Sequence, residues 1–248
     1  MPGERGRGAG MNEVRPETRE YLDGLFTPGL RIGGDAHTPY SWIEIAEVQG
    51  VTAIRLPSGR LVVDSPWNTE PPRELAFRIP PGEYLVDVSW ANWPHLSDGY
   101  YNEYRQCAAT RLRIRDEPVV TWELALGVGE DPALRAAGAG FEAEESMGCF
   151  ADATAWRPLT EPFRRHLTDV AAGFGGPVPG RDTEDRFELV REDLCEGFFD
   201  LVRDEAHRAD LLTFGVPEGW GQVWEGRTHE GEVAVIVAPG HVPTSPWD

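Results

Sequence analysis

Two segments in which proline and glycine interrupt apolar runs constrain the fold of this chain most strongly. Residues 56–64 carry Pro-Ser-Gly-Arg at positions 57–60, and residues 79–88 carry Pro-Pro-Gly at positions 80–82. Proline presets φ for the first turn position, and glycine supplies a position with positive φ. The flanking residues are apolar and rich in β-branched side chains, so both segments predict turns between strands. The chain is therefore expected to be largely antiparallel β.

The remaining pattern predicts a mainly β (α+β) fold, a twisted antiparallel sheet or open β-barrel or sandwich decorated by a few helices. Three- and four-residue spacing of apolar side chains predicts helices over 14–26 and 182–209, and a proline near its start favours a short helix over 131–137. The strands are expected at 42–48, 51–56, 60–64, 75–79, 83–90, 105–114, 118–126, 211–214, 222–225 and 233–237. A single β-rich domain is expected over 14–240, between a disordered tail at 1–13 and a tail at 241–248.

Charge narrows the class of partner. The 248 residues include 42 acidic and 23 basic side chains, a net charge of −19, and every basic side chain is arginine. Nucleic acids and anionic membranes require a basic face, so neither is an expected partner. A basic protein fits better, although a soluble acidic protein needs no such partner. No apolar run reaches membrane-spanning length and the start resembles no signal peptide, so a cytoplasmic location is expected, with Met1 or Met11 as the true start.

Cysteine and histidine supply no recognisable metal or cofactor motif. The cysteines at positions 107, 149 and 195 lack C-x-x-C spacing, and the six histidines lack H-E-x-x-H spacing. We therefore expect no cofactor and no metal site of a known pattern.

One cysteine and four carboxylates are candidates for chemistry. Cys149 follows a glycine in Gly-Cys-Phe-Ala-Asp and would serve as a nucleophile beside a histidine base, or as a buried apolar side chain. Asp64, Glu123 and Asp152 (and, with them, Asp87) stand in or near predicted strands among apolar neighbours. Convergence of two such carboxylates would form an acid–base pair or a cation site, whereas separate carboxylates would cap turns or pair with arginine.

An aromatic segment over 90–104 is the candidate partner surface. Trp93, Tyr100, Tyr101 and Tyr104 lie in a polar stretch rich in turn-forming residues, which we interpret as an exposed loop. Tryptophan and tyrosine dominate binding hot spots, so these four side chains are predicted to contact a partner. The alternative is a partly covered structural loop.

Taken together, five motifs resemble a bacterial family known as domain of unknown function 4241. They are the Pro-Ser-Gly-Arg turn with Asp64, Pro-Pro-Gly-Glu-Tyr at 80–84, Trp-Glu-Leu-Ala-Leu at 122–126, Gly-Cys-Phe-Ala-Asp at 148–152, and the aromatic hairpin at 214–224. The resemblance runs from about residue 21 to residue 239. It departs from the family at 215–222, where the expected aspartate within the glycine-rich turn is missing. The resemblance implies one compact fold and brings no activity with it.

These observations lead to a binding or regulatory protein, such as an immunity-type protein, as the expected function. The alternatives are a hydrolase with a carboxylate site, with or without a metal ion, and a small-ligand binder. They differ in whether Asp64, Glu123, Cys149 and Asp152 converge in one cleft.

Overall fold

Antiparallel strands are the main secondary structure of the described residues, as the proline–glycine turns predict. The computed structural model describes residues 16–33, 42–68, 71–97, 100–174, 195–196 and 199–240, with only the backbone at several positions that include 93–97, 100–104 and 195–196. All but one of the described strand pairs are antiparallel, and the helices are short.

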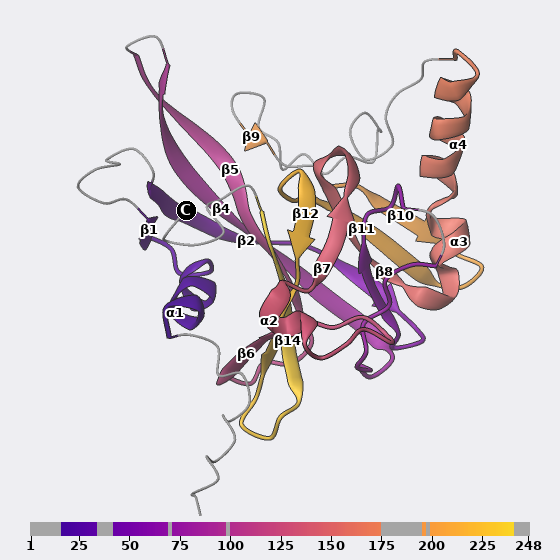
Figure 1. Cartoon of the computed structure of the whole chain (residues 1–248), viewed down its shortest axis with the longest axis horizontal. Coiled ribbons are helices and arrows are strands. Elements are labelled where there is room, and N and C mark those ends of the chain that lie inside the picture. The colour runs from indigo at the N-terminus through magenta and orange to yellow at the C-terminus, as the bar shows by residue number, and fades with distance from the viewer. Residues whose placement is uncertain are drawn as a thin grey trace, which may run out of the picture.

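The larger sheet has eight strands in the order β1-β2-β4-β5-β14-β13-β6, with the short β9 parallel to one end of β5. Its strands are β1 (Arg31–Gly33), β2 (Trp42–Leu56), β4 (Gly82–Ser97), β5 (Tyr100–Arg113), β6 (Thr121–Leu124), β9 (Cys195–Glu196), β13 (Trp224–Arg227) and β14 (Val233–Pro239). The β4–β5 hairpin is its longest pair and extends beyond the other strands (Figure 1).

A second sheet has the order β10-β11-β8-β3, and a two-stranded ribbon pairs β12 with β7. Their strands are β3 (Leu61–Asp64), β7 (Gly140–Ala143), β8 (Met147–Asp152), β10 (Leu201–Asp204), β11 (Ala209–Gly215) and β12 (Gly219–Gln222). The helices are α1 (Pro16–Gly24), α2 (Leu134–Ala137), η1 (Glu144–Ser146), η2 (Ala153–Ala155), α3 (Trp156–Leu159) and α4 (Glu161–Ala171).

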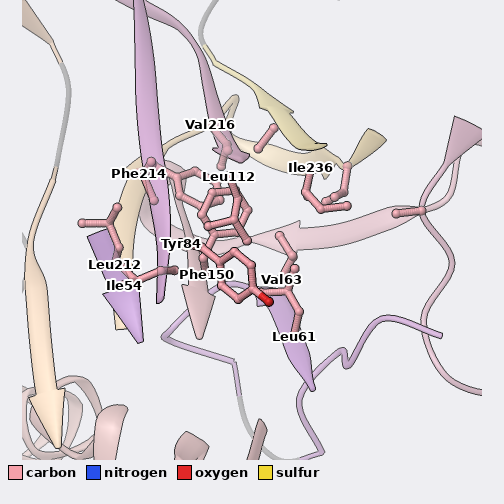
Figure 2. Close-up of a cluster of buried hydrophobic side chains, with 14 of the residues drawn as sticks. Ile54, Leu61, Val63, Tyr84, Leu112, Phe150, Leu212, Phe214, Val216 and Ile236 are labelled. Atoms are coloured by element: carbon pink, nitrogen blue, oxygen red, sulfur yellow. The ribbon is translucent and has the colours of Figure 1, made fainter. Parts of the chain in front are cut away.

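The two sheets enclose the main core, and helices cover their outer faces. Ile54, Leu112 and Ile236 of the larger sheet pack with Phe150 and Phe214 of the second sheet (Figure 2). Helix α1 covers the outer face of the larger sheet, while α3 and the start of α4 cover that of the second (Figure 1). Alternation along β8 explains this arrangement, since Phe150 faces the main core and its neighbours Cys149 and Ala151 face the helices.

Several predicted elements are confirmed with shifted bounds. The helix expected over 14–26 is α1, and its apolar face packs through Tyr21, Leu22 and Leu25. The two strands expected over 42–56 are the single strand β2, with irregular register near residues 45–47 and 50–52. The strand expected at 75–79 is wrong. Leu75 forms only an isolated bridge, because prolines on both sides limit the available N–H donors.

The exposed loop expected over 90–104 is also wrong. Strands β4 and β5 stay paired up to Ser97 and Tyr100, so this segment is a hairpin. Cross-strand pairing outweighs the local turn-forming residues there, since the peptide groups that face the partner strand gain hydrogen bonds.

The helix expected over 182–209 is wrong in its second half, and residues 182–194 lie outside the described part of the chain. Residues 195–196, 201–204 and 209–215 form β9, β10 and β11. A turn joins β10 to β11, in which Asp204 accepts a hydrogen bond from the amide of Ala206 (2.9 Å) and Arg208 takes a φ of 53°. Of the apolar residues at this three- and four-residue spacing, Leu201 lies in the described part of the chain, and there it pairs with Leu212 in the antiparallel β10–β11 pair.

Candidate functional site

Asp64 organises the loop that follows β3. It is 4% exposed and accepts hydrogen bonds from the amides of Ser65 (2.8 Å) and Arg73 (2.8 Å) and from the side-chain amide of Asn68 (2.6 Å). Burial raises the pKa of Asp64, while these hydrogen bonds act in the opposite direction. Asp64 also lies opposite Cys149 in the β3–β8 pair. The carboxylate therefore helps to hold Ser65, Asn68 and Arg73 in position after β3.

We expect the stability advantage of the wild type over Asp64→Asn to decrease as the pH rises. Because its pKa in the folded chain is raised above 3.8, Asp64 binds its proton more tightly when folded, and ionisation costs the folded state free energy. Urea unfolding of both proteins between about pH 3 and about pH 7 measures the difference between their free energies of unfolding. The titration of all other groups contributes equally to both proteins and cancels in this difference. A difference that grew with pH would contradict the raised pKa.

Asp152 joins two family motifs. Its carboxylate is fully buried and accepts hydrogen bonds from the amide and hydroxyl of Ser58 (2.8 Å each) and from the amide of Thr154 (2.9 Å). Ser58 belongs to the Pro-Ser-Gly-Arg turn, and Thr154 lies in η2. The Asp152 carboxylate thus ties the β2–β3 turn to the end of β8.

Glu123 lies apart from the other candidates. It sits on β6 in the larger sheet, where it forms an ion pair with Arg135 (2.6 Å). Arg135 also pairs with Glu225 (3.0 Å), a buried carboxylate that Arg227 contacts as well (3.0 Å). Burial raises the pKa of Glu225, and the two arginines oppose that shift. The structure therefore brings Asp64 and Cys149 together, places Asp152 farther along the same strand pair, and leaves Glu123 elsewhere.

Cys149 has the environment of a structural thiol. It is fully buried on β8 among side chains that include Val62 and Ala151. Burial raises the pKa of Cys149 well above its ordinary value, and the nearby Asp64 carboxylate raises it further. A thiolate at neutral pH is disfavoured in such surroundings.

A thiol probe is therefore expected to leave Cys149 unmodified in the native protein. In a Cys195→Ser background, both remaining thiols should react only after denaturant is added, because Cys107 is fully buried as well. Cys149→Ser should lower the free energy of unfolding by about 1–3 kcal/mol, since it buries a hydroxyl. Rapid native labelling at neutral pH, assigned to Cys149 by peptide mass, would contradict this interpretation.

The predicted partner residues Trp93, Tyr100, Tyr101 and Tyr104 lie on the β4–β5 hairpin. Their backbone is in strands, and their side chains lie outside the described part of the structure.

A groove with one acidic and one apolar wall lies where the Asp64 loop meets α4 and the β7–β12 ribbon. Its volume is about 420 Å³, and we call it the acidic groove; it is lined by Trp67, Glu142, Ala143, Glu144, Glu145, His166, Leu167, Val170, Glu218 and Gly219. Trp67 is 4% exposed and packs edge-on against Phe163 of α4, with ring centroids 5.1 Å apart. The side chain of Asn68 also donates to the carbonyl of Glu142 (3.0 Å), so the loop held by Asp64 is joined to the acidic wall.

The acidic wall carries charge without compensation. The side chains of Glu142, Glu144 and Glu218 are exposed and form no ion pair with any described residue. Glu145 and Ser146 beside them both have a φ of 55°, a conformation that costs a side-chain-bearing residue about 1 kcal/mol or more. The amide of Val216 donates to the Ser146 carbonyl (3.0 Å) and helps to hold this conformation. The fold thus maintains a strained segment that presents carboxylates to the groove.

The apolar wall is the free part of the α4 face. Phe163 is fully buried, but Leu167 and Val170, one and two turns later, are 46% and 52% exposed. Phe174, just after the helix, and Trp220, opposite Glu142 on β12, are 71% and 51% exposed. Figure 1 shows α4 extending away from the second sheet, and Phe163 in its first turn is the one buried residue of this helix. Leu167 and Val170 line the groove together, and exposed apolar side chains grouped in this way mark interaction surfaces.

None of these groove residues was predicted from the sequence. Pro162 in the first turn of α4 and the spacing of Phe163, Leu167 and Val170 are a helix signal that could have been found. The acidic wall has no local signal, because it joins segments around residues 67, 142, 166 and 218.

Comparison with known proteins identifies a family and no individual relative. A family model described as "Protein of unknown function (DUF4241)" matches residues 54–238. No curated protein and no solved structure matches the chain. Within the described residues, no group of three or more histidine, cysteine, aspartate or glutamate side chains could hold a metal ion, and no helix is long and apolar enough to cross a membrane.

Proposed function

The chain belongs to the DUF4241 family, and we propose from the geometry of the acidic groove that it is a binding or regulatory protein. Its partner would be a basic, partly apolar segment of another protein. The observation that carries the proposal is that one groove combines three carboxylates, which form no ion pair within the described part of the chain, with the exposed apolar face of α4.

The charge of the groove supports a cationic partner. Two buried carboxylates elsewhere pair with arginine: Asp87 with Arg111 (2.7 Å) and Asp210 with Arg55 (2.7 Å). In the groove, Glu142, Glu144 and Glu218 form no ion pair with an arginine among the described residues. Arginine or lysine side chains of a partner would supply the missing charge and accelerate the encounter.

The apolar wall favours a protein segment, rather than a small cation, as the partner. Leu167 and Val170 lie one turn apart on α4, and the exposed Phe174 follows them. An amphipathic segment would bury these side chains while its basic side faces the glutamates. Burial of apolar area supplies affinity, and the charges supply specificity.

The hydrolase alternative receives less support from the placement of its candidate residues. Asp64 and Asp152 are buried, and each accepts at least three hydrogen bonds from neighbouring backbone or side-chain groups. Those contacts account for both carboxylates as organisers of loops. Glu123 lies on β6 of the larger sheet, away from Asp64 and Asp152, and pairs with Arg135 of α2.

Calorimetric titration with two synthetic peptides tests the proposal. An arginine- and leucine-rich amphipathic peptide should bind, and its glutamate-substituted counterpart should not. The double variant Glu142→Arg/Glu218→Arg should weaken binding about tenfold, because it removes attraction and adds repulsion. The matched control, Glu83→Arg/Glu230→Arg, makes the same charge change at exposed, unpaired positions outside the groove and should bind like the wild type at equal salt.

Salt and stability distinguish the possible outcomes. Binding through the groove should weaken steeply as salt increases, because exposed charges are screened beyond about 8 Å at physiological ionic strength. Equal binding by both double variants would reject the groove as the site. If the groove variant instead lowers the melting temperature without changing affinity, the carboxylates serve the fold and the proposal fails.

A further inference from the structure

A second cavity lies on the opposite side of the molecule, between α1 and the outer face of the larger sheet. Its volume is about 460 Å³, and we call it the arginine cavity; it is lined by Leu22, Asp23, Phe26, Arg111, Arg113, Arg115, Asp116, Glu117, Val119, Trp122 and Val235. The three arginines alternate along β5 and the residues after it, so their side chains share one face of the sheet. Cavities of this size accommodate small organic molecules.

Most of the hydrogen-bond donors of these arginines have no acceptor among the described residues. Arg111 donates twice to Asp87 (3.1 and 2.7 Å), and Arg115 donates once to Glu232 (3.2 Å). Arg113 donates no hydrogen bond to any described residue. It forms ion pairs with Asp87 (3.1 Å) and Asp116 (4.0 Å) that lack hydrogen-bond geometry. The Nε atoms of Arg113 and Arg115 are buried without a hydrogen-bond partner among the described residues. Buried donors left in this state cost the folded protein free energy.

The acidic side chains around the cavity do not meet this demand. Asp87 is already shared between Arg111 and Arg113. Asp23 accepts a hydrogen bond from the indole of Trp122 (3.0 Å) and contacts Arg19 (3.5 Å). Asp116 is 98% exposed to water, and Glu117, which is also exposed, forms no ion pair with any described residue. The guanidinium of Arg113 is therefore the group with the greatest unused capacity for an anion.

We propose that the arginine cavity binds a small organic anion, with its carboxylate or phosphate group on Arg113 and its apolar body against Phe26, Val119 and Trp122. A guanidinium matches the paired oxygens of either group in a bidentate arrangement. The ring of Phe26 is already covered by Arg111, whose guanidinium carbon lies 4.2 Å from the ring centroid, which holds Arg111 beside the site. This site is separate from the acidic groove and does not depend on the proposed function.

Calorimetric titration of the full chain with four probes tests the site. Phenylacetate and phenyl phosphate should bind, whereas 2-phenylacetamide, a neutral analogue of the same shape, and inorganic phosphate should bind at least about tenfold more weakly. Whichever organic anion binds more tightly identifies the preferred anionic group.

Variants at one position give the structural control. Arg113→Gln should weaken binding of the organic anions about tenfold or more, and Arg113→Lys, which keeps the charge without the planar fork, should fall between it and the wild type. Arg78→Gln makes the same charge change at a site outside the cavity and should leave binding unchanged. Both glutamine variants should melt within a few degrees of the wild type.

Three results would overturn the proposal. They are equal binding of phenylacetate and its amide, equal affinity of Arg113→Gln and the wild type, and equal affinity for phenyl phosphate and inorganic phosphate. If Arg113→Gln unfolds, the titration of Arg113→Lys tests the proposal instead. An affinity of Arg113→Lys for the organic anions identical to that of the wild type would overturn bidentate recognition.

Discussion

Replacement of Asp152 by alanine is expected to lower the free energy of unfolding by about 3–5 kcal/mol. The carboxylate is fully buried, and its removal leaves the amides of Ser58 and Thr154 and both of their hydroxyls without this acceptor. Water cannot replace it without entering a packed region. The loss should therefore exceed that of an ordinary exposed cap.

Chemical denaturation monitored by far-UV circular dichroism measures this loss. Asp131→Ala is the matched control, because Asp131 also accepts a backbone hydrogen bond, from Ala133 (2.8 Å), but in an exposed turn. It should cost about 0.5–1 kcal/mol. Equal effects of the two alanine substitutions would show that Asp152 does not hold the β2–β3 turn to β8.

Gly59→Ala should be destabilising by about 2–4 kcal/mol. Gly59 has a φ of +65°, and a Cβ atom there would overlap the carbonyl oxygen of Ile79. The backbone would have to move, which would break the hydrogen bond from the Ile79 amide to the Gly59 carbonyl (3.1 Å).

Gly129→Ala separates the cost of a positive φ from the cost of steric overlap with Ile79. Gly129 has a φ of +81°, and a Cβ atom there would meet nothing within 4 Å. Its cost should be only the conformational one, about 1 kcal/mol. Thermal unfolding of both variants would show whether the close approach to Ile79 adds to this cost, and similar melting temperatures would contradict the packing described for the turn.

Local signals in the sequence account for much of the β architecture. The Pro-Ser-Gly-Arg turn does connect β2 to β3, and alternating apolar side chains predict most of β5. Both signals arise from neighbouring residues, whose turn geometry and strand period are intrinsic. The helix predicted over 182–209 failed beyond residue 194 because Leu201 and its neighbours pair with β11, a contact that periodicity does not encode.

The candidate site was less predictable than the fold. The sequence identified Asp64, Cys149 and Asp152 as special, and the structure relates them through the β3–β8 pair and their hydrogen bonds. It did not reveal the acidic groove, since Trp67, Glu142 and Glu218 meet only after the Asp64 loop and the β7–β12 ribbon have formed. A cluster made by distant segments has no spacing to detect.

The β4–β5 hairpin and the acidic groove are two distinct candidate surfaces for one partner. The hairpin carries Trp93 and Tyr101, which the sequence favours, whereas the described side chains favour the groove. Figure 1 shows the hairpin and α4 extending from different sides of the molecule, so one small contact cannot include both.

Site-specific photo-crosslinking in the native host tests the central claim most directly. A photoreactive phenylalanine analogue would replace Leu167 in one version of the full chain and Trp93 in another. We predict a protein adduct at Leu167 that high salt suppresses, that Glu142→Arg/Glu218→Arg abolishes and that Glu83→Arg/Glu230→Arg leaves intact, with the adduct protein basic in its crosslinked segment. An adduct at position 93 alone, or one at Leu167 that persists in the groove variant, would contradict binding through the acidic groove.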